Sequence, residues 1–178
     1  MAKRLNTENI AEWCDKLSVG EEILLSGVVY TARDAVHKKL FEMLDNAQEL
    51  PIVLSGASIY YAGPTPKKDG LAIGSCGPTT SSRMDKFTQR LLDLGLKCMI
   101  GKGERSDDVI NSIVRNHAVY LCAIGGAGAL ASRSVKECET VAFDELGCES
   151  LKRLVIADLP LIVAINSQGD NIFKRNGK

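Results

Sequence analysis

The sequence predicts a single α/β domain. Segments rich in Ile, Leu and Val, which are typical of strands, are followed by segments whose apolar residues recur at helical spacing. The composition supports the same class, because 45% hydrophobic residues with only 5% aromatics and 16 glycines suit an α/β protein better than a disordered or fibrous one. A length of 178 residues corresponds to about one domain. We therefore expect one domain over residues 1–172 and a polar tail over residues 173–178.

The first half of the chain alternates predicted strands and helices. The helical segments carry apolar residues that share a face, such as Val36 and Leu40, and the strands are runs of aliphatic residues. A polar stretch with Pro and Gly over 63–70 predicts a loop. In chain order, the predicted elements are a helix at 6–17, a strand at 22–30, a helix at 33–47, and short strands at 52–54, 58–61 and 71–75.

The second half continues the alternation. A helix begins within 77–85, carries an apolar stripe that includes Phe87, and ends before Gly95. Ser106 is the predicted N-cap of the next helix, which has acidic residues in its first turn. The small residues over 125–131 predict a loop with one helical turn. The predicted strands of this half lie at 98–101, 118–124, 139–143, 153–157 and 161–165.

The balance of charges excludes two classes of partner. The 22 Lys and Arg residues equal the 22 Asp and Glu residues, so no basic excess points to nucleic acid or to an anionic membrane. Any cationic site must be local. The N-terminal segment lacks the apolar core of a secretory signal, and the longest apolar stretch, 154–165, is too short to cross a bilayer. We expect a soluble, cytoplasmic protein.

The six cysteines do not follow a metal-binding pattern. No two of them are closer than ten positions, so the chain has no CxxC clip. Disulfide frameworks belong mainly to short secreted chains. We therefore expect reduced thiols, most of them buried as small hydrophobic groups, and no metal site in this chain.

The strongest candidate site is the segment GPTTSSRMD, which ends at Asp85. A strand leads into a helix here, and the unpaired N–H groups of a helix start, with the hydroxyls of Thr79 and Thr80, can bind an anion. A cation at Arg83, in the first turn, is unfavourable for the helix dipole and indicates a bound negative group. The alternative is ordinary capping by a Ser82 and Asp85 capping box, which leaves the threonines and Arg83 unexplained.

A second candidate lies where another predicted strand meets a helix. Arg33 and His37 are one helical turn apart at the carboxyl end of that strand, where ligands of open α/β sheets bind. Lys102 lies between two glycines just after a third strand. Local pairing for Arg33 and a solvated His37 are the alternatives, and tight packing is the expected role of GGAG at 125–128, which lacks dinucleotide-loop spacing. Arg33, Arg83 and Lys102 suit a small substrate with two carboxylates, because the arginine fork grips a carboxylate at two points.

Six segments of the chain, in this order and spacing, resemble a known family. They are SGVVYTARDAVH (26–37), YAGP (61–64), GPTTSSRMD (77–85), IGKG (100–103), IGG (124–126) and PLIVAINSQGDN (160–171). The family is the β subunit, or C-terminal domain, of the class I iron–sulfur fumarate hydratases and the related tartrate dehydratases. The resemblance extends over nearly the whole chain, and GPTTSSRMD is its most specific part.

The resemblance implies the swivelling β/β/α domain, a sheet-rich α/β fold with flanking helices that closes over a site on its partner. It implies the reversible hydration of fumarate to (S)-malate. The [4Fe–4S] cluster would be held by three cysteines of a partner α subunit in an α2β2 assembly, with one iron open to the substrate and no ligand from this chain. The matching motifs make Arg33, Thr79, Thr80, Arg83 and Lys102 contacts to the substrate.

The resemblance leaves the catalytic base open between Thr79 and His37. An unperturbed histidine titrates near neutrality, whereas a threonine needs strong activation by nearby cations. The alternative functions are an L-tartrate dehydratase β subunit, a non-catalytic dicarboxylate-binding module and a purely structural interaction subunit. Cys76, one residue before Gly77, is a candidate for a reactive thiol close to the predicted site.

Overall fold

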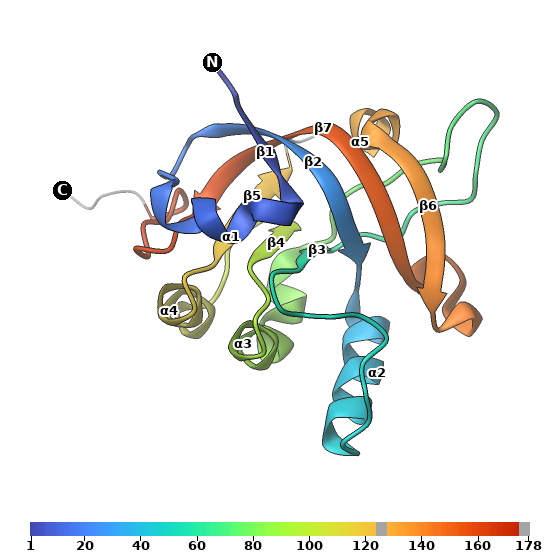
Figure 1. Cartoon of the computed structure of the whole chain (residues 1–178), viewed down its shortest axis with the longest axis horizontal. Helices are drawn as coiled ribbons and strands as arrows, with labels where there is room; N and C mark the ends of the chain where they lie inside the picture. Colours follow the sequence, from blue (N-terminus) through green and yellow to red (C-terminus); the bar gives the residue numbers. More distant parts are fainter. Residues whose placement is uncertain (124–127, 175–178) are drawn as a thin grey trace.

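Seven strands form one sheet within the described residues, 1–123 and 128–174, of the computed structural model (Figure 1). The strands are β1 (Lys3–Asn6), β2 (Glu22–Thr31), β3 (Ser58–Tyr60), β4 (Cys98–Gly101), β5 (Val119–Ala123), β6 (Val135–Ala142) and β7 (Leu151–Ile165). Their order is β1-β2-β3-β4-β5-β7-β6, and β7 also pairs with β2. The strands β2, β3, β4, β5 and β7 therefore close into a barrel-like ring.

Helices and short 3-10 turns flank this ring, which confirms the sheet-rich α/β class (Figure 1). They are η1 (Thr7–Asn9), α1 (Ile10–Trp13), η2 (Cys14–Lys16), α2 (Asp34–Asp45), η3 (Ser81–Met84), α3 (Asp85–Asp93), α4 (Asp107–Arg115), α5 (Gly128–Ser134) and η4 (Asp144–Glu149). None of the helices in the described ranges is long and apolar enough to cross a membrane.

The direction of the strands determines where the candidate site lies. The strands β1 to β5 run parallel to one another. The strand β7 runs antiparallel to β2, β5 and β6. In one row of the sheet, Thr31 of β2 lies beside Tyr60 of β3, and Tyr60 lies beside Ile100 of β4. The residues that follow this row leave the sheet at one edge, the carboxyl end of three parallel strands.

Two hydrophobic clusters cover the two faces of the strands. Cys98 and Ile100 of β4 belong to a cluster that takes residues from every strand of the ring and so forms its interior. Met99, between them, belongs to the second cluster with Leu40 of α2 and Leu91 of α3. Successive side chains of a strand point to opposite faces, so β4 contributes to both clusters. The second cluster thus attaches the helices to the outside of the ring.

The predicted strands at 153–157 and 161–165 are parts of one strand, β7. Asp158 has a φ of 50°, and the register of β7 against β2 shifts next to it. Its backbone N–H donates to Ser26 Oγ at 3.0 Å. A bulge of this kind bends a strand, which allows β7 to pair with β2 on one side and with both β5 and β6 along its length.

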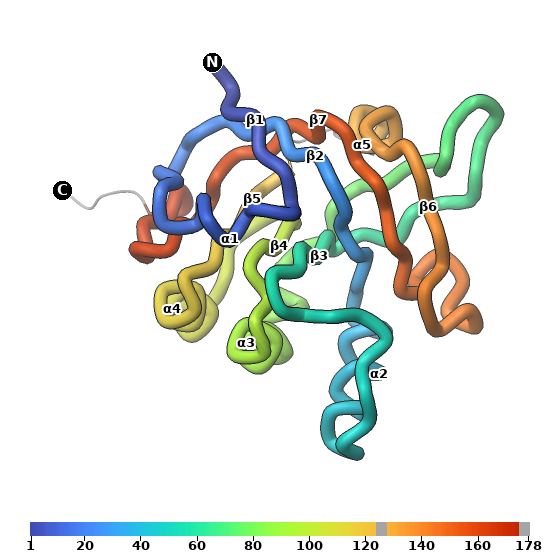
Figure 2. Tube along the Cα trace, in the orientation of Figure 1, coloured from blue at the N-terminus to red at the C-terminus, as the bar shows by residue number. Residues whose placement is uncertain are grey.

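Three other predicted elements are wrong. Residues 52–54 and 71–75 form no strand, although apolar side chains such as Ile73 are buried there. A short apolar run indicates burial, and a loop packed on the core also provides burial. The predicted helix at 6–17 is limited to the single turn of α1 between two 3-10 turns. The segment between β3 and α3 swings out past β6 and includes the predicted loop at 63–70 (Figure 2).

Two predictions reach beyond the described residues. The predicted loop at 125–131 falls partly on residues 124–127, and α5 begins at Gly128. Most of the predicted tail, 175–178, also lies outside the described part of the chain. Lys174 is described, and its Nζ atom lies 2.8 Å from Asp107 Oδ1 at the start of α4.

Candidate active site

The predicted site residues gather at the edge where β2, β3 and β4 end. Arg33 comes two residues after Thr31 and Lys102 two residues after Ile100, so both lie just beyond the ends of β2 and β4. The equivalent residue after β3 is Ala62, which forms an isolated bridge with Pro78, the neighbour of Thr79. The parallel strands therefore bring together three segments that are far apart in the sequence.

Arg33 is the N-cap residue of α2 and has an extended backbone. Its Nη1 atom lies 3.1 Å from Oε1 of Glu149. Gly63 lies beside the guanidinium, since a Cβ atom built there would lie 3.4 Å from Nη1, an ordinary van der Waals distance. The Nε atom is buried and has no hydrogen-bond partner among the described residues. An unpaired buried donor is unfavourable, and a carboxylate oxygen would satisfy it.

His37 lies fully buried one turn into α2. Its Nδ1 atom lies 2.8 Å from the carbonyl oxygen of Arg33, which also accepts the backbone N–H of His37 at 3.0 Å. Because a carbonyl oxygen can only accept a hydrogen bond, this contact assigns the proton of the neutral imidazole to Nδ1. The ring packs between Tyr61 and Phe87, with centroids at 5.7 Å and 5.4 Å.

Burial lowers the pKa of His37 to about 4, despite the hydrogen bond to Arg33. The imidazole is therefore neutral at physiological pH, and its Nε2 atom is buried without a partner among the described residues. Both alternatives from the sequence, a solvated polar residue and a histidine that titrates near neutrality, are wrong for this environment.

Thr79 and Thr80 directly precede η3, next to the ends of β3 and β4. The N–H of Thr79 donates to the carbonyl of Tyr61 at 2.7 Å. Thr80 forms a parallel bridge with Lys102. Ser81 completes this link, because its N–H donates to the carbonyl of Lys102 at 2.9 Å and its Oγ accepts the N–H of Lys102 at 3.0 Å. The threonines and the lysine thus belong to one hydrogen-bonded unit.

Arg83 pairs with a carboxylate of this chain. Its Nη2 atom lies 2.8 Å from Oδ2 of Asp34, and its Nε donates to Oδ1 at 3.3 Å. Asp34 follows Arg33 directly, so one carboxylate connects the two segments that carry the arginines. The structure thus supplies an internal negative partner where the sequence indicated a bound anion. The Arg83 side chain remains 51% exposed, which leaves it accessible.

The capping box predicted for Ser82 and Asp85 is absent from this described segment. The N-cap of η3 is Thr80, without a side-chain hydrogen bond. The carboxylate of Asp85 instead accepts from Arg105 Nε at 2.6 Å and from the N–H of Ser106 at 2.7 Å. Arg105 is a residue that the sequence reasoning missed, because only its position before the N-cap Ser106 could have drawn attention to it. Ser106 does cap α4, as predicted, by accepting the N–H of Val109.

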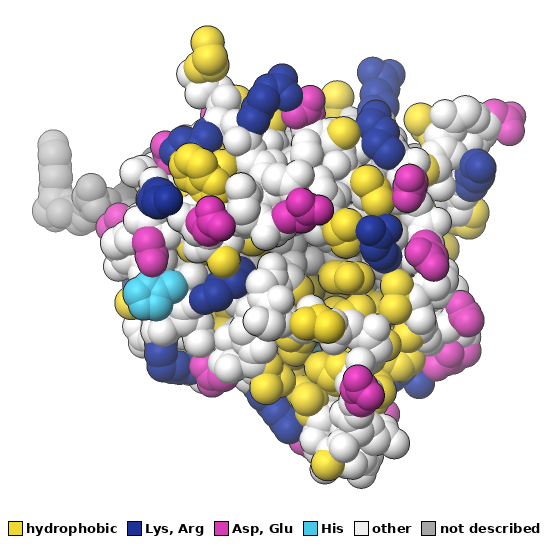
Figure 3. All heavy atoms as spheres, in the orientation of Figure 1, with side chains coloured by type: hydrophobic (Ala, Val, Ile, Leu, Met, Phe, Trp, Pro, Cys, Tyr) yellow, Lys and Arg dark blue, Asp and Glu magenta, His cyan; other side chains and the backbone are white. Residues whose placement is uncertain are grey.

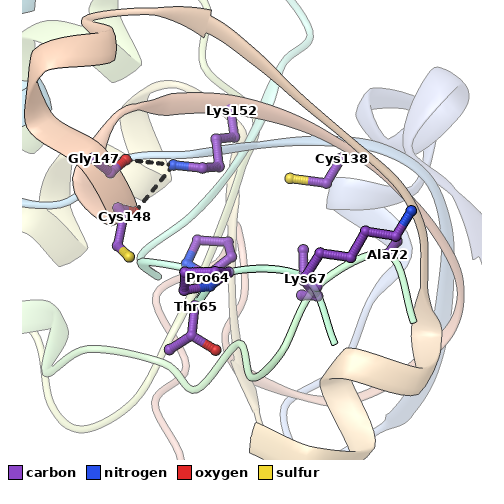
Figure 4. A pocket seen from close by; sticks show the side chains of 10 residues that line it. Pro64, Thr65, Lys67, Ala72, Cys138, Gly147, Cys148 and Lys152 are labelled. Atoms are coloured by element: carbon purple, nitrogen blue, oxygen red, sulfur yellow. Dashed lines mark hydrogen bonds between the residues drawn. The ribbon is translucent and has the colours of Figure 1, made fainter. Parts of the chain in front are cut away.

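A pocket of about 420 Å³ lies beside the Arg33 end of the site, and none of the predicted site residues lines it. Its lining includes Pro64 and Cys148, and a Cβ atom built on the adjacent Gly63 would lie near both the Arg33 side chain and the carbonyl of Cys148. Figure 4 shows Lys152 turned towards the carbonyl groups of Gly147 and Cys148, to which its Nζ donates. Its ammonium group therefore already has acceptors within the protein.

Charges of both signs are interspersed on the face shown in Figure 3, while hydrophobic side chains gather between the ring and α2. The mixture of positive and negative side chains on this face agrees with the net charge of zero, and this face carries no large patch of one sign. The local cations Arg33, Arg83 and Lys102 are balanced in part by Glu149 and Asp34.

The six cysteines are free thiols, and three of them, Cys14, Cys76 and Cys98, are buried. Burial raises the pKa of Cys76 to about 12, so this thiol is neither exposed nor ionised, and the suggestion that it is reactive is wrong for this fold. Within residues 1–123 and 128–174, no group of three or more His, Cys, Asp or Glu side chains is placed to hold a metal ion. The described residues therefore do not fit an iron–sulfur cluster, which needs several thiolates at one point.

Comparisons with known proteins show the family of this chain. A family model described as Fumarase C-terminus matches residues 2–176. A putative L(+)-tartrate dehydratase subunit beta from Methanocaldococcus jannaschii is 40% identical over 169 residues, which cover 92% of this chain and 87% of that protein. The L(+)-tartrate dehydratase subunit beta of Escherichia coli is 34% identical over 183 residues, which cover 100% of this chain and 90% of the relative.

The fumarate hydratases are longer than this chain. The aerobic class I fumarate hydratase of Escherichia coli is 36% identical over 159 residues, which cover 88% of this chain but 29% of the relative. The chain thus spans about 30% of the length of the fumarate hydratases and most of the length of the beta subunits. With the family model matching almost every residue, this chain belongs to the Fumarase C-terminus family.

Proposed function

We propose that this chain is the β subunit of a class I fumarate hydratase and catalyses, with a cluster-bearing partner, the reversible hydration of fumarate to (S)-malate. The observation that carries the proposal is the common location of Arg33, Thr79, Thr80, Arg83 and Lys102 at the carboxyl ends of β2, β3 and β4. Membership of the Fumarase C-terminus family, and the similarity to a class I fumarate hydratase of Escherichia coli, support the same reaction.

In this proposal Arg33, Arg83 and Lys102 hold the two carboxylates of the substrate. An arginine can bind a carboxylate through two parallel hydrogen bonds, and a lysine adds a compact positive charge. Without substrate, Glu149 and Asp34 pair with the arginines. Partly exposed ion pairs contribute only about 0–1 kcal/mol, so an incoming dicarboxylate can replace them.

Proton transfer at C3 is the chemical step that this chain serves. Removal of a proton next to a carboxylate builds negative charge on that carboxylate, and the three cations stabilise this charge more in the transition state than in the ground state. Thr79 is the proposed base, because its segment lies at the same edge as the cations, which stabilise an alkoxide. The buried, neutral His37 is assigned to hold Arg33, through the hydrogen bond to the Arg33 carbonyl.

The partner α subunit is the proposed holder of the [4Fe–4S] cluster. The described residues of this chain lack a suitable set of thiolates, and this chain matches only 29% of the length of an Escherichia coli fumarate hydratase. The remaining length of such an enzyme would correspond to the partner. The α2β2 arrangement, the cytoplasmic location and the single domain over 1–172 stay predictions.

Tartrate dehydration is the second candidate, and a specific observation favours it. The tartrate dehydratase beta subunits match this chain over 87% and 90% of their own length, whereas the fumarate hydratase of Escherichia coli matches over 29% of its length. Both reactions add or remove water at a small dicarboxylate, and the same cations would serve both. The choice between them depends on the hydroxyl groups of the substrate.

Reconstitution with the cluster-bearing α subunit tests these proposals. Fumarate–malate interconversion by the complex, and by neither chain alone, supports the hydratase. Dehydration of L-tartrate without hydration of fumarate supports the tartrate enzyme, and a panel of dicarboxylates ranks the two. Binding of dicarboxylates by the isolated chain, with no activity in any mixture, would contradict both and support a binding module.

A further inference from the structure

The buried guanidinium of Arg105 is connected through hydrogen bonds to segments of the candidate site. Arg105 stands between β4 and α4, and its side chain is fully buried. It donates through Nε to Asp85 Oδ1 at 2.6 Å and through Nη2 to Thr88 Oγ1 at 2.7 Å and to the Tyr61 hydroxyl at 3.3 Å. A buried charge is unfavourable unless it is paired and hydrogen-bonded, and these partners satisfy that requirement.

Two tyrosine rings enclose the guanidinium, and each is bonded to a part of the site. The Arg105 Cζ atom lies 5.3 Å from the ring of Tyr61 and 4.9 Å from the ring of Tyr120, distances typical of cation–π contacts. The carbonyl of Tyr61 accepts the N–H of Thr79 at 2.7 Å. The Tyr120 hydroxyl lies 2.8 Å from Oγ of Ser81.

These contacts reach four predicted substrate contacts through intermediate residues. Tyr61 connects Arg105 to Thr79, as described above. Tyr120 connects it to Ser81, which bonds in both directions with Lys102 and directly follows Thr80. Asp85 connects it to the end of η3, the turn that carries Arg83. Arg105 has no hydrogen bond to any of the four residues predicted to contact the substrate, within the described part of the chain.

We propose that Arg105 is a positioning residue that keeps Thr79, Thr80, Arg83 and Lys102 in the geometry needed for the reaction. The proposal rests on the function proposed above. A displacement of about 1 Å in a reacting group can reduce a rate by about 10²-fold, so one rigid link behind three separate segments has a large effect on turnover. Its planar fork, with donors in fixed directions, suits contacts to several elements at once.

The alternative is that Arg105 only stabilises the packing of α3 against α4. A matched control for that role exists at the other end of the same two helices, where Arg115 Nη2 lies 2.8 Å from Asp93 Oδ1. Both arginines thus pair with an aspartate of α3, but Arg115 is exposed and lies away from the site. Arg105→Lys keeps the positive charge near Asp85 and loses the fork, and Arg115→Lys makes the same exchange without touching the site.

A second variant removes one oxygen and leaves the ion pair in place. Tyr120→Phe retains the aromatic ring beside Arg105 and loses the hydroxyl contacts to Ser81 and to the Gly103 carbonyl, 2.9 Å away. This variant carries the test if Arg105→Lys does not fold, since it preserves the buried charge and its partners.

The first measurement is steady-state kinetics of the reconstituted complex. We expect kcat to fall about 10- to 100-fold for Arg105→Lys and by a smaller factor for Tyr120→Phe, with Arg115→Lys unchanged. A thermal unfolding scan identifies the fraction of folded protein, so the loss is assigned to turnover. Unchanged kcat in folded Arg105→Lys, or in Tyr120→Phe where the lysine variant does not fold, would overturn the proposal.

The second measurement does not depend on activity. Hydrogen–deuterium exchange of the full chain reports the amides of Thr79, Ser81 and Lys102, which are all hydrogen-bonded in the structure. Arg105→Lys should speed exchange at all three, and Tyr120→Phe mainly at Ser81 and Lys102. If the wild-type complex hydrates no fumarate, the proposed function fails. The exchange rates of the Thr79, Ser81 and Lys102 amides then decide by themselves whether Arg105 holds these residues in place. Exchange equal to that of Arg115→Lys would then overturn the positioning role.

Discussion

The Nδ1 atom of His37 lies 2.8 Å from the carbonyl oxygen of Arg33, one helical turn earlier. This bond directs the proton-bearing nitrogen of the ring to the backbone of the residue proposed to hold a substrate carboxylate. The opposite nitrogen, Nε2, is buried without a hydrogen-bond partner among the described residues, and the ring lies against Tyr61 and Phe87. In this arrangement His37 holds the backbone of Arg33 and Thr79 acts as the proposed base, so substitutions of the two residues should have different effects on proton exchange.

Thr79→Ala should abolish exchange of the C3 hydrogen with solvent, whereas His37→Asn should retain it with a raised KM. The reason is that the alanine lacks the proposed base, while loss of the imidazole loosens Arg33. Incubation of the reconstituted complex with malate in D2O, followed by mass analysis of the substrate pool, measures the exchange. Loss of exchange in His37→Asn and retention in Thr79→Ala would reverse the assignment.

Burial of His37 should make the protein less stable in weak acid. The pKa of His37 is about 4 in the folded chain and 6.5 in the reference state, so the unfolded chain binds the proton first as the pH falls. The free energy of unfolding therefore decreases from about pH 6.5 down to about pH 4, by up to about 3 kcal/mol, and this contribution is constant below that range.

Urea unfolding of the wild type and of His37→Phe, at several pH values across this interval, measures the effect. The phenylalanine cannot titrate, and the carboxylates of the two proteins respond alike. We expect a steeper loss of stability with falling pH in the wild type. Parallel curves for the two proteins would show that the histidine is protonated equally in the folded and unfolded chains.

Arg83→Ala should reduce kcat/KM of the reconstituted complex by about 10²-fold or more, because in the proposed mechanism Arg83 stabilises the negative charge that develops on the substrate. Arg90→Ala is the matched control, since Arg90 pairs with Asp45 of α2 at 2.6 Å, as Arg83 pairs with Asp34. Exposed pairs of this kind contribute only about 0–1 kcal/mol, so both variants should unfold near the wild-type temperature. Equal activity in the two variants would exclude Arg83 from substrate binding.

Glu149→Gln should lower the KM for the dicarboxylate, by up to about fivefold, because Glu149 competes with the substrate for Arg33 at 3.1 Å. Glu145→Gln provides the control, as Glu145 lies in the same η4 turn and pairs with Lys39 instead. Initial-rate kinetics over a range of substrate concentrations measures KM for both. A higher KM for Glu149→Gln would mean that Glu149 orients Arg33 for the substrate.

Iodoacetamide should alkylate Cys148 well before Cys76 in the native chain. Cys148 is exposed, whereas Cys76 is fully buried with its pKa raised to about 12. The thiolate is the reactive form, so a buried neutral thiol reacts only when the chain opens. Peptide mapping by mass spectrometry after short exposures gives the order, and early modification of Cys76 would contradict the described burial.

The parts of the site that depend on local chemistry were predictable. The β2 to α2 junction at Arg33, the strand before Lys102 and the cap at Ser106 follow from side-chain periodicity and from short-range hydrogen bonding, both of which act within one turn or one strand. The resemblance added the family, which the family model supports. The roles of the five substrate contacts stay predictions.

By itself the sequence determined the class of the fold, the order of most strands and helices, and which segments carry hydroxyls and cations. Only the tertiary structure decided which distant groups meet. Arg83 pairs with Asp34, 49 residues away, and the buried Arg105 with Asp85, 20 residues away, because strand pairing and core packing bring these segments together. Tertiary packing also left 52–54 and 71–75 without strand partners and removed His37 from water. Burial and pairing depend on surfaces from several elements, so no local pattern contains them.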